Sequence, residues 1–359
     1  MSLVTDSIER LIPYQAGKPI EELARELGVE NPIKLASNEN PLGPSPKALE
    51  AAREVLAEVH RYPDGAGYAL RKSLADRHGV PLEEVLHGHG SNELIELIMR
   101  TFTTRDHHVV FGTPAFAMYP VTAMAHGVEF TAVATRDYQH DLEGMLEAVR
   151  PNTRLVIIDN PNNPTGTYVG RETVERFLRQ LPPEVIVVMD EAYFEYADAP
   201  DYPDCLKLRE LRERLIVIRT FSKIYGLAGF RVGYAIGPAR LLNYVNRLRA
   251  PFNVGIVGQR AALAALTDEE HVQRSRHLNL EERKRLTREL GDLGVQVTPS
   301  QANFVFCNFA RPAQQIYDAM LRRGVILRPF PKLPSALRIT AGTEKENTRM
   351  LQALGEVLS

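Results

Sequence analysis

The chain has 359 residues, a formal net charge of −2 and only two cysteines. This length is enough for a large core but long for one globular unit, so we expect two lobes. The near-neutral charge gives no reason to expect nucleic acid or an anionic membrane as a partner. Cys205 and Cys307 stand far apart without a metal-like spacing, so neither a disulfide framework nor a zinc site is indicated.

The N-terminal residues carry acidic side chains early and lack the long apolar stretch of a signal peptide. No segment of the sequence approaches the apolar length that crosses a bilayer. We therefore expect a cytoplasmic protein without a membrane partner.

The first part of the chain alternates helical patterns with a loop. Residues 19–28, 46–59 and 67–79 have the apolar spacing of helices. Between the first two of them stands LASNENPLGPSP (35–46), whose prolines and glycines are too frequent for regular structure. A loop of this kind, held against a scaffold, often lines a functional site.

From about residue 85 the pattern alternates between strands and helices. Helices are predicted at 91–102, with Ser91 as the N-cap, and at 171–181. Short apolar, β-branched runs end in polar or turn residues in HVVFGTP, RLVIIDNP, EVIVVMDEAY and RLIVIRTFSK. Strands this uniformly apolar are buried on both faces, which predicts an α/β fold with a mainly parallel central sheet covered by helices.

A different pattern follows residue 255. A long helical stretch, roughly 256–290, leads to the shorter strands GVQVTPS, NFVFCNF, VILRPF and ALRIT. That shift predicts a smaller α+β domain. We expect residues 46–250 to form the large domain and residues 251–359 the small domain, and residues 1–45 to contribute to the small domain and the substrate site.

Polar side chains follow three of the predicted strands, where ligands of open α/β sheets bind. One strand is followed by Asn163, the next by Asp190 and Tyr193, and the third by Lys223. If these strands are parallel, the four side chains converge on one edge of the sheet. Each has an ordinary explanation when taken alone, as a turn, a helix cap or a surface lysine. Their conjunction is much less expected by chance.

Pyridoxal phosphate chemistry needs these four groups together. The amine of Lys223 would join the cofactor aldehyde, and Asp190 would keep the pyridine nitrogen protonated so that the ring draws electrons. Asn163 and Tyr193 would donate hydrogen bonds to the phenolic oxygen. Phe116, in GTPAFAMYP, is the candidate to stack on the pyridine face, although a plain core role is nearly as common for such an aromatic residue.

The sequence also offers a site for the cofactor phosphate. GHGSNE is a glycine-containing turn that leads into a helix, where backbone N–H groups bind dianions. The hydroxyls of Ser91 and Ser222 and the guanidinium of Arg231 would complete the site. His87 and His89 in the same turn lack a third ligand at a sensible spacing, so no metal is expected.

Nine motifs follow one another in the order found in histidinol-phosphate aminotransferases: SNENPLGPSP, RYPDG, GSNE, NPNNPTG, DEAYFEY, TFSKIYGLAGFRVGY, PFNV, ILRPF and LRITAGTEKEN. The chain therefore resembles this family of fold-type I pyridoxal-phosphate enzymes over essentially its whole length. The spacing of lysine and arginine in TFSKIYGLAGFR is typical of aminotransferases in general, whereas NENPLGPSP and LRITAGT point to this subfamily.

The resemblance implies the cofactor roles given above for the four strand-end residues, and it adds Asn92 to the phosphate-binding residues. Tyr62, in RYPD, resembles the tyrosine that reaches the cofactor phosphate of the neighbouring subunit, which implies a homodimer with shared active sites. Two motifs depart from the family pattern: GSNE often has an aspartate before the glutamate, and TPAF is more commonly TPTF or TPTY. The first matters little if backbone N–H groups bind the phosphate, and the second keeps an aromatic residue.

Substrate-binding residues are implied in the same way. Arg338, in LRIT, resembles the arginine that binds the substrate carboxylate, and Arg328, in LRPF, the one that assists at the distal anion. Tyr14 and Asn38 resemble substrate contacts from the N-terminal segment. The implied reaction transfers the amino group of L-histidinol phosphate to 2-oxoglutarate in histidine biosynthesis, by ping-pong chemistry.

Other functions stay open from the sequence. An aromatic amino acid aminotransferase is compatible with the same residues, because an aromatic ring can occupy the imidazole pocket. A phosphothreonine-type decarboxylase on the same fold shares most of the cofactor residues. A non-catalytic, effector-binding regulator is disfavoured, because only about 45 residues precede the large lobe and they do not resemble a winged-helix domain.

Overall fold

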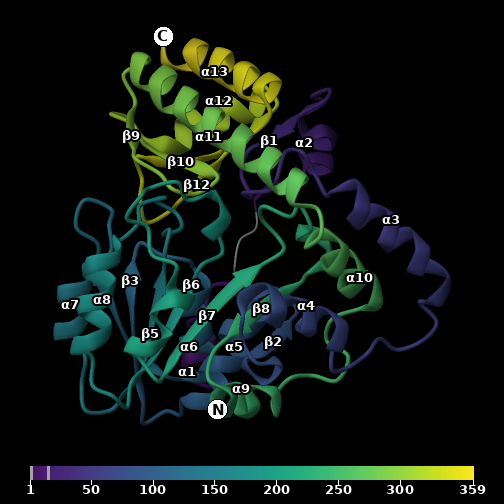
Figure 1. Ribbon diagram of the computed structural model, residues 1–359. Helices are drawn as coiled ribbons and strands as arrows, with labels where there is room; N and C mark the ends of the chain where they lie inside the picture. The colour runs from purple at the N-terminus through teal and green to yellow at the C-terminus, as the bar shows by residue number, and fades with distance from the viewer. Residues whose placement is uncertain (1–2, 14–16) are drawn as a thin grey trace.

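In the computed structural model, residues 3–13 and 17–359 are described. They form two parts (Figure 1): a large sheet with its helices lies low in the view, and a smaller sheet lies above it beneath the helices labelled α11, α12 and α13. The short helix α1 (Asp6–Glu9) contacts helix α6 (Met118–His126) of the lower part.

The large sheet has seven strands in the order β2-β8-β7-β6-β5-β3-β4. Strand β8 is antiparallel to both of its neighbours, and the other pairs are parallel. The predicted fold class, an α/β fold with a mainly parallel central sheet, is therefore confirmed. The strands are β2 (Val85–Gly88), β3 (His108–Thr113), β4 (Glu129–Ala134), β5 (Thr153–Asp159), β6 (Ile186–Asp190), β7 (Leu215–Thr220) and β8 (Gly233–Ile236).

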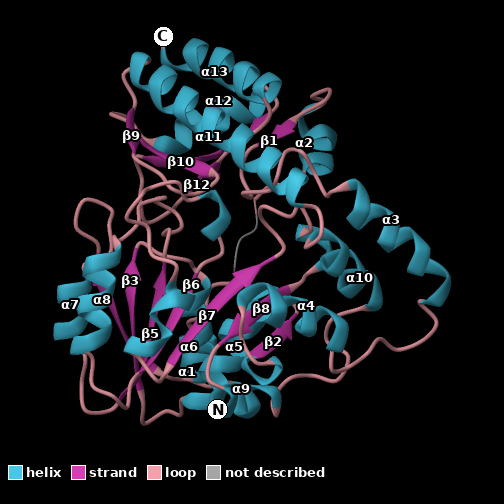
Figure 2. Ribbon diagram, in the orientation of Figure 1, coloured by secondary structure: helices cyan, strands magenta, loops and turns pink. Residues whose placement is uncertain are grey.

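Helices cover both faces of this sheet (Figure 2), because successive side chains of each strand point to opposite faces. In β3, Val109 and Phe111 pack into the cluster that includes α5 and α6, whereas Val110 packs into the cluster that includes α7 and α8. The remaining helices of this part are α3 (Pro46–Glu54), α4 (Tyr68–His78), α5 (Gly90–Phe102), α7 (Leu142–Glu147), α8 (Arg171–Gln180), α9 (Ala239–Asn246) and α10 (Ile256–Ala265).

The upper part is built on an antiparallel sheet with the strand order β12-β13-β10-β9. The N-terminal segment joins this part, since β1 (Ile33–Lys34) pairs in parallel with β11 (Val325–Ile326). The other elements are α2 (Ile20–Leu27), α11 (Glu269–Asp292), β9 (Gln296–Thr298), β10 (Phe304–Asn308), α12 (Ala313–Arg322), β12 (Arg328–Pro329), β13 (Ala336–Thr340) and α13 (Glu344–Leu358).

Several expected elements differ in detail. Helix α5 begins at Gly90 and its N-cap position is His89, so the prediction that Ser91 caps it is wrong; Ser91 lies in the first turn. The helical stretch predicted at roughly 256–290 is two helices: α10 ends at Ala265, and Asp268 caps the start of α11 by accepting from the His271 N–H. Helix α10 packs against α3 and α4, and the domain boundaries at residues 45 and 250 stay predictions.

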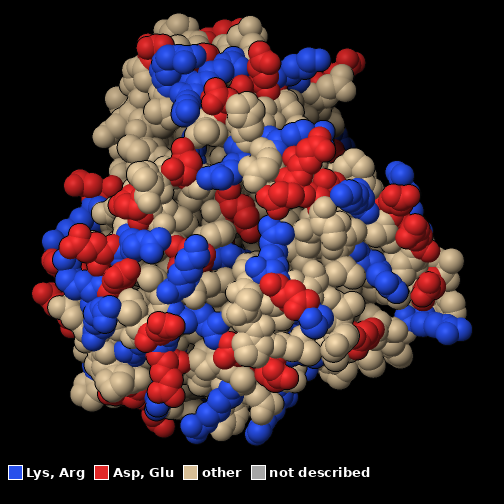
Figure 3. Space-filling view, viewed as in Figure 1, with Lys and Arg blue, Asp and Glu red and all other residues tan. Residues whose placement is uncertain are grey.

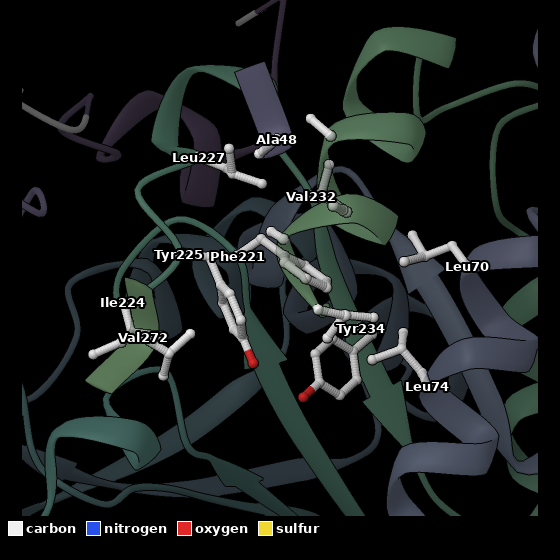
Figure 4. Close-up of a cluster of buried hydrophobic side chains, with 14 of the residues drawn as sticks. Ala48, Leu70, Leu74, Phe221, Ile224, Tyr225, Leu227, Val232, Tyr234 and Val272 are labelled. Atoms are coloured by element: carbon white, nitrogen blue, oxygen red, sulfur yellow. The ribbon is translucent and has the colours of Figure 1, made fainter. Parts of the chain in front are cut away.

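A buried apolar cluster supports the segment between β7 and β8 (Figure 4). Phe221, Tyr225 and Tyr234 lie together at its centre, and Leu70 and Leu74 of α4 pack against them. Burying each large apolar side chain contributes about 1.5–3 kcal/mol. The cluster therefore holds the backbone on both sides of residue 223 in a fixed position.

The surface in Figure 3 intersperses basic and acidic side chains without a large region of one sign. In the described part of the chain, no helix is both long enough and apolar enough to span a membrane. Five short 3₁₀ helices complete the described elements: η1 (Val55–Glu58), η2 (Leu82–Glu84), η3 (Phe194–Tyr196), η4 (Cys205–Leu211) and η5 (Ala228–Phe230).

Candidate active site

A cavity lies at the carboxyl ends of β5, β6 and β7, where the upper part faces the large sheet. Residues of the N-terminal segment, the start of α5, the strand ends and loops of the large sheet, and strands β12 and β13 line it. Twelve of the predicted site residues line the cavity: Asn38, Ser91, Asn92, Phe116, Asn163, Asp190, Tyr193, Ser222, Lys223, Arg231, Arg328 and Arg338.

Lys223 follows β7 by three residues, and its side chain is half-buried in the cavity wall. Its Nζ lies 3.4 Å from the carbonyl oxygen of Ser37. Burial, and then the positive charge of Arg338, lower the pKa of Lys223 to about 8. A larger share of this amine is therefore unprotonated near neutrality than is usual for lysine, which makes it a better nucleophile.

Asp190 is the last residue of β6 and is 3% exposed. Its Oδ2 accepts a hydrogen bond from the Tyr119 hydroxyl at 3.0 Å, and its Oδ1 accepts from the Ala192 N–H at 3.2 Å. Burial, and then the nearby charge of Asp159, raise the pKa of Asp190 to about 7. Such a carboxylate strongly favours a cationic N–H group placed against it, because ionisation of the carboxylate then gains a partner.

The N-terminus of α5 also lines the cavity, through Ser91 and Asn92. The Arg231 guanidinium reaches it from the β7–β8 segment, and its Nη1 donates to Ser222 Oγ at 3.2 Å. The backbone packs closely here, since a Cβ on Gly90 would lie 2.5 Å from Arg231 Nη2 and a Cβ on Gly233 would lie 2.6 Å from the Ser91 nitrogen. Helix N–H groups, serine hydroxyls and a guanidinium together form a site for a dianion.

Arg231 adopts the left-handed backbone conformation, with φ of 55°. For a residue other than glycine this conformation is strained, and such strain is concentrated at functional sites. In the same region, Asn92 Oδ1 is buried and has no hydrogen-bond partner in the described structure. Both features fit a bound group that interacts with these side chains.

Arg338, on β13, forms another part of the cavity wall. Its Nη1 donates to Asn163 Oδ1 at 2.5 Å, and its Nη2 donates to the carbonyl oxygen of Ala36 at 2.6 Å. Phe116 lies in the cavity wall just before α6, with its ring 5.7 Å from the Tyr119 ring in an edge arrangement. Arg328 also lines this cavity, on β12.

One predicted site residue, Tyr62, lies away from the cavity. Tyr62 is 81% exposed and stacks on Phe252 with a centroid distance of 4.6 Å, and it is not among the described residues that line the cavity. Tyr14 lies outside the described residues. Among the described residues, no group of three metal-binding side chains includes His87 or His89.

Asp159, the last residue of β5, also lines the cavity but was not among the predicted site residues. It pairs in register with Asp190, its Oδ2 accepts the Asn163 N–H at 2.9 Å, and its Oδ1 lies 2.9 Å from Nε2 of the buried His140. The same rule that selected Asp190, a polar residue that ends an apolar strand, also applies to Asp159. Tyr119 was missed because nothing in its local sequence connects it with a strand end.

A family model for aminotransferase class I and II matches residues 30–354. The chain is 47% identical to histidinol-phosphate aminotransferase 2 of Pseudomonas aeruginosa, over 100% of this chain and 98% of that protein. It is 48% identical to histidinol-phosphate aminotransferase of Anaeromyxobacter, over 100% of both chains.

Solved structures of aminotransferases are similar to this chain as well. Histidinol-phosphate aminotransferase from Sinorhizobium meliloti, in complex with pyridoxal-5'-phosphate, has a TM-score of 0.90 and 29% identity, over 100% of this chain and 98% of that one. A Thermus thermophilus aspartate aminotransferase mutant, at 24% identity and a TM-score of 0.86 over 99% and 100% of the two chains, has the same fold. The chain belongs to the class I and II aminotransferases, and within them to the histidinol-phosphate aminotransferase family.

Proposed function

We propose that this enzyme binds pyridoxal 5'-phosphate and transfers the amino group of L-histidinol phosphate to 2-oxoglutarate, giving imidazole-acetol phosphate and L-glutamate in histidine biosynthesis. The observation that carries the proposal is one cavity in which a lysine of lowered pKa and a buried aspartate lie beside a site for a dianion. We also propose that the reaction takes place in the cytoplasm. Both cysteines are free and buried, as is common in a reducing compartment.

The residues present fit the cofactor at each of its functional groups. The N-terminus of α5, with Ser91, Asn92, Ser222 and Arg231, would hold its phosphate. Asp190 would face the ring nitrogen, and the remaining ring contacts would come from Phe116, Asn163 and Tyr193. When bound, pyridoxal phosphate supplies an aldehyde that accepts an amino group and a protonated ring that draws electrons from the reacting carbon.

Lys223 would serve as nucleophile toward the cofactor and then as general base. With its pKa lowered to about 8, its Nζ can take a proton from the substrate α-carbon and return it during one catalytic cycle near neutrality. The ionised carboxylate of Asp190 would stabilise positive charge at the ring nitrogen. These roles divide the work between a group that moves protons and a group that keeps its charge fixed.

The two substrates differ in their anionic groups, since histidinol phosphate lacks the α-carboxylate of glutamate. One site must then bind a phosphate in one half-reaction and carboxylates in the other. Arginine suits this duty because its fork accepts either oxyanion with two hydrogen bonds. We assign the substrate carboxylate to Arg338 and the distal anion to Arg328, both of which line the cavity.

A substrate panel tests the function. Histidinol phosphate, phenylalanine, tyrosine and phosphothreonine are each supplied with 2-oxoglutarate, and both glutamate formation and carbon dioxide release are followed. We expect the largest kcat/KM for glutamate formation with histidinol phosphate. A larger kcat/KM with phenylalanine or tyrosine would favour an aromatic aminotransferase, and carbon dioxide from phosphothreonine would favour a decarboxylase.

The lowered pKa of Lys223 predicts the pH dependence of cofactor capture. Only the unprotonated amine attacks an aldehyde, so the rate at which cofactor-free protein captures pyridoxal phosphate should rise with pH and reach half its maximum near pH 8. Stopped-flow absorbance measures this rate. A half-maximum near the ordinary lysine value of 10.5 would contradict the lowered pKa.

Arg338→Ala should impair the half-reaction with glutamate and 2-oxoglutarate more than the half-reaction with histidinol phosphate. Loss of the guanidinium leaves a bound α-carboxylate unpaired, and we expect kcat/KM for 2-oxoglutarate to fall about 100-fold. Arg338→Lys is the matched control, because it keeps the charge but loses the planar fork of the guanidinium. Its kcat/KM for 2-oxoglutarate should lie between the values for wild type and Arg338→Ala. Equal and small losses in both half-reactions would argue against this assignment.

We propose a homodimer in which each subunit completes the active site of the other. Tyr62 and Phe252 form an exposed aromatic stack, and monomeric proteins rarely expose large contiguous apolar surface without an interaction to cover it. Tyr62 also lies outside the cavity of its own chain. We place its hydroxyl at the cofactor phosphate of the partner subunit.

Mixing two inactive variants tests this arrangement. If Lys223→Ala and Tyr62→Ala subunits are mixed, unfolded and refolded together, half of the dimers are mixed and each contains one intact site. The mixture should therefore regain about a quarter of wild-type activity. Activity equal to the mean of the separate variants would show that Tyr62 acts within its own chain or not at all.

A further inference from the structure

Asn38 lies in the cavity wall with its side chain already engaged by the protein. It is 1% exposed, and its Nδ2 lies 2.8 Å from the Tyr193 hydroxyl oxygen. On its other side, the Thr340 hydroxyl oxygen accepts the Asn38 backbone N–H at 3.0 Å. The same Thr340 hydroxyl donates to Asn38 Oδ1 at 3.1 Å.

These contacts fix which way the amide points. The Thr340 hydroxyl has one proton, and among the described residues the acceptor found for it is Asn38 Oδ1. The opposite amide orientation would leave that buried proton without an acceptor, which is costly. Nδ2, which can only donate, therefore faces Tyr193.

The direction of this hydrogen bond determines what Tyr193 can do. Because Asn38 donates to the Tyr193 oxygen, the tyrosine must direct its own proton elsewhere. Tyr193 is 3% exposed and lines the cavity, and no hydrogen bond donated by it is found among the described residues. Burial also raises the pKa of Tyr193 to about 12, so the hydroxyl keeps its proton at neutral pH.

The backbone at Asn38 is built to hold this geometry. Its φ is 55°, a left-handed conformation that asparagine and aspartate tolerate better than other residues with a side chain. Its carbonyl oxygen accepts from Asn303 Nδ2 at 3.0 Å, so both of its backbone groups are bound by residues of the upper part. Such local strain persists only where the surrounding contacts maintain it.

We infer that Asn38, oriented by Thr340, is a positioning residue that directs the Tyr193 hydroxyl proton into the cavity, toward the phenolic oxygen of the cofactor. The inference rests on the proposed function, because it needs the cofactor in this cavity. It assigns Asn38 a role through Tyr193, whereas the role expected from the resemblance, a substrate contact, stays a prediction.

Asn38→Asp tests the direction of the hydrogen bond. Aspartate has the same shape and tolerates the same φ, but its carboxylate accepts the tyrosine proton and so turns it away from the cavity. We expect kcat/KM to fall about 10- to 100-fold. When Tyr193 no longer donates to the phenolic oxygen of the bound cofactor, that oxygen would interact more strongly with the protonated nitrogen beside it. That nitrogen would then lose its proton at a higher pH, so the pH midpoint of the visible absorbance of the loaded protein should rise by about one unit.

Thr340 offers a matched pair without a change of charge. Thr340→Val removes the hydroxyl that orients the amide, and it should raise the absorbance midpoint and lower kcat/KM in the same direction as Asn38→Asp, but less. Thr340→Ser keeps the hydroxyl and should behave as wild type. Melting temperatures and the Kd for pyridoxal phosphate show whether each variant is folded and loaded.

A double-mutant cycle with Tyr193→Phe decides between positioning and substrate contact. If Asn38 acts through the tyrosine hydroxyl, its effects should nearly vanish when Tyr193 is already phenylalanine. In that background, Asn38→Asp should leave the absorbance midpoint almost unchanged and should change kcat/KM by less than about twofold. Effects of the same size in both backgrounds would overturn the inference, as would a wild-type midpoint in Asn38→Asp. Wild-type protein that does not bind the cofactor would instead contradict the proposed function.

Discussion

Lys223→Ala is expected to lower turnover of histidinol phosphate by about 10,000-fold, because one amine acts as both nucleophile and general base. The variant should remain folded. Lys223 is a polar group held in a buried wall by the apolar cluster around Phe221 and Tyr225, so replacing it relieves a desolvation cost. Steady-state kinetics and the visible absorbance of the loaded protein measure the loss.

Two control variants show which property of Lys223 matters. Lys223→Arg keeps a positive charge but no usable base, so it should be as inactive as the alanine variant. Lys47→Ala removes an exposed lysine whose Nζ donates to the Thr267 carbonyl, and it should leave turnover unchanged. A small primary amine in solution should restore part of the activity of Lys223→Ala. Near-normal turnover in Lys223→Ala would disprove the assignment.

Asp190→Asn is expected to lower kcat by about 100- to 1,000-fold, since an amide cannot balance positive charge at the ring nitrogen. The shape of the side chain is kept, and the Tyr119 hydroxyl can still donate to the amide oxygen. The pH dependence of stability provides a second measurement. Burial raises the pKa of Asp190 from 3.8 to about 7, so ionising it in the folded, cofactor-free chain costs free energy.

The sign of this effect can be worked out from the two pKa values. The stability linked to protonated Asp190 is fully present below the unfolded value of 3.8 and is lost as the pH rises through about 7. Cofactor-free Asp190→Asn lacks this loss, so it should melt at a higher temperature than wild type above pH 7 and at a similar temperature near pH 4. Thermal melts across this range measure it.

Asp159→Asn is the matched control, because Asp159 ends the neighbouring strand in register with Asp190. It should lower kcat much less than Asp190→Asn, since its oxygens are bound to the Asn163 N–H and to His140. Wild-type kcat in Asp190→Asn, or an equal loss in both variants, would contradict the role given to Asp190.

Much of the fold could be predicted because the strands of the sheet centre are apolar throughout. The runs that became β3, β5, β6 and β7 are buried on both faces, and their uniform composition identifies them. Strand β4 is partly exposed, and β2 and β8 have only four residues each, so their patterns were too weak. The place of β8 in the sheet follows from its pairing with β2 and β7, which are distant in sequence from each other.

The candidate site was predictable where a residue's role follows from its place at a strand end. Asn163, Asp190 and Lys223 meet because parallel strands end at one edge, a rule that needs no tertiary information. The hydrogen bond from Asn38 to Tyr193 joins residues 155 positions apart and depends on how the N-terminal segment folds over the sheet. Local sequence carries no signal for such a contact.

Trapping the covalent link between protein and cofactor tests the proposed mechanism most directly. Loaded protein is reduced with borohydride and digested, and the modified peptide is identified by mass. We predict that the cofactor is found on Lys223, and that adding histidinol phosphate before reduction releases it from that residue. Cofactor attached to another lysine, or protein that carries none after reduction, would contradict the mechanism.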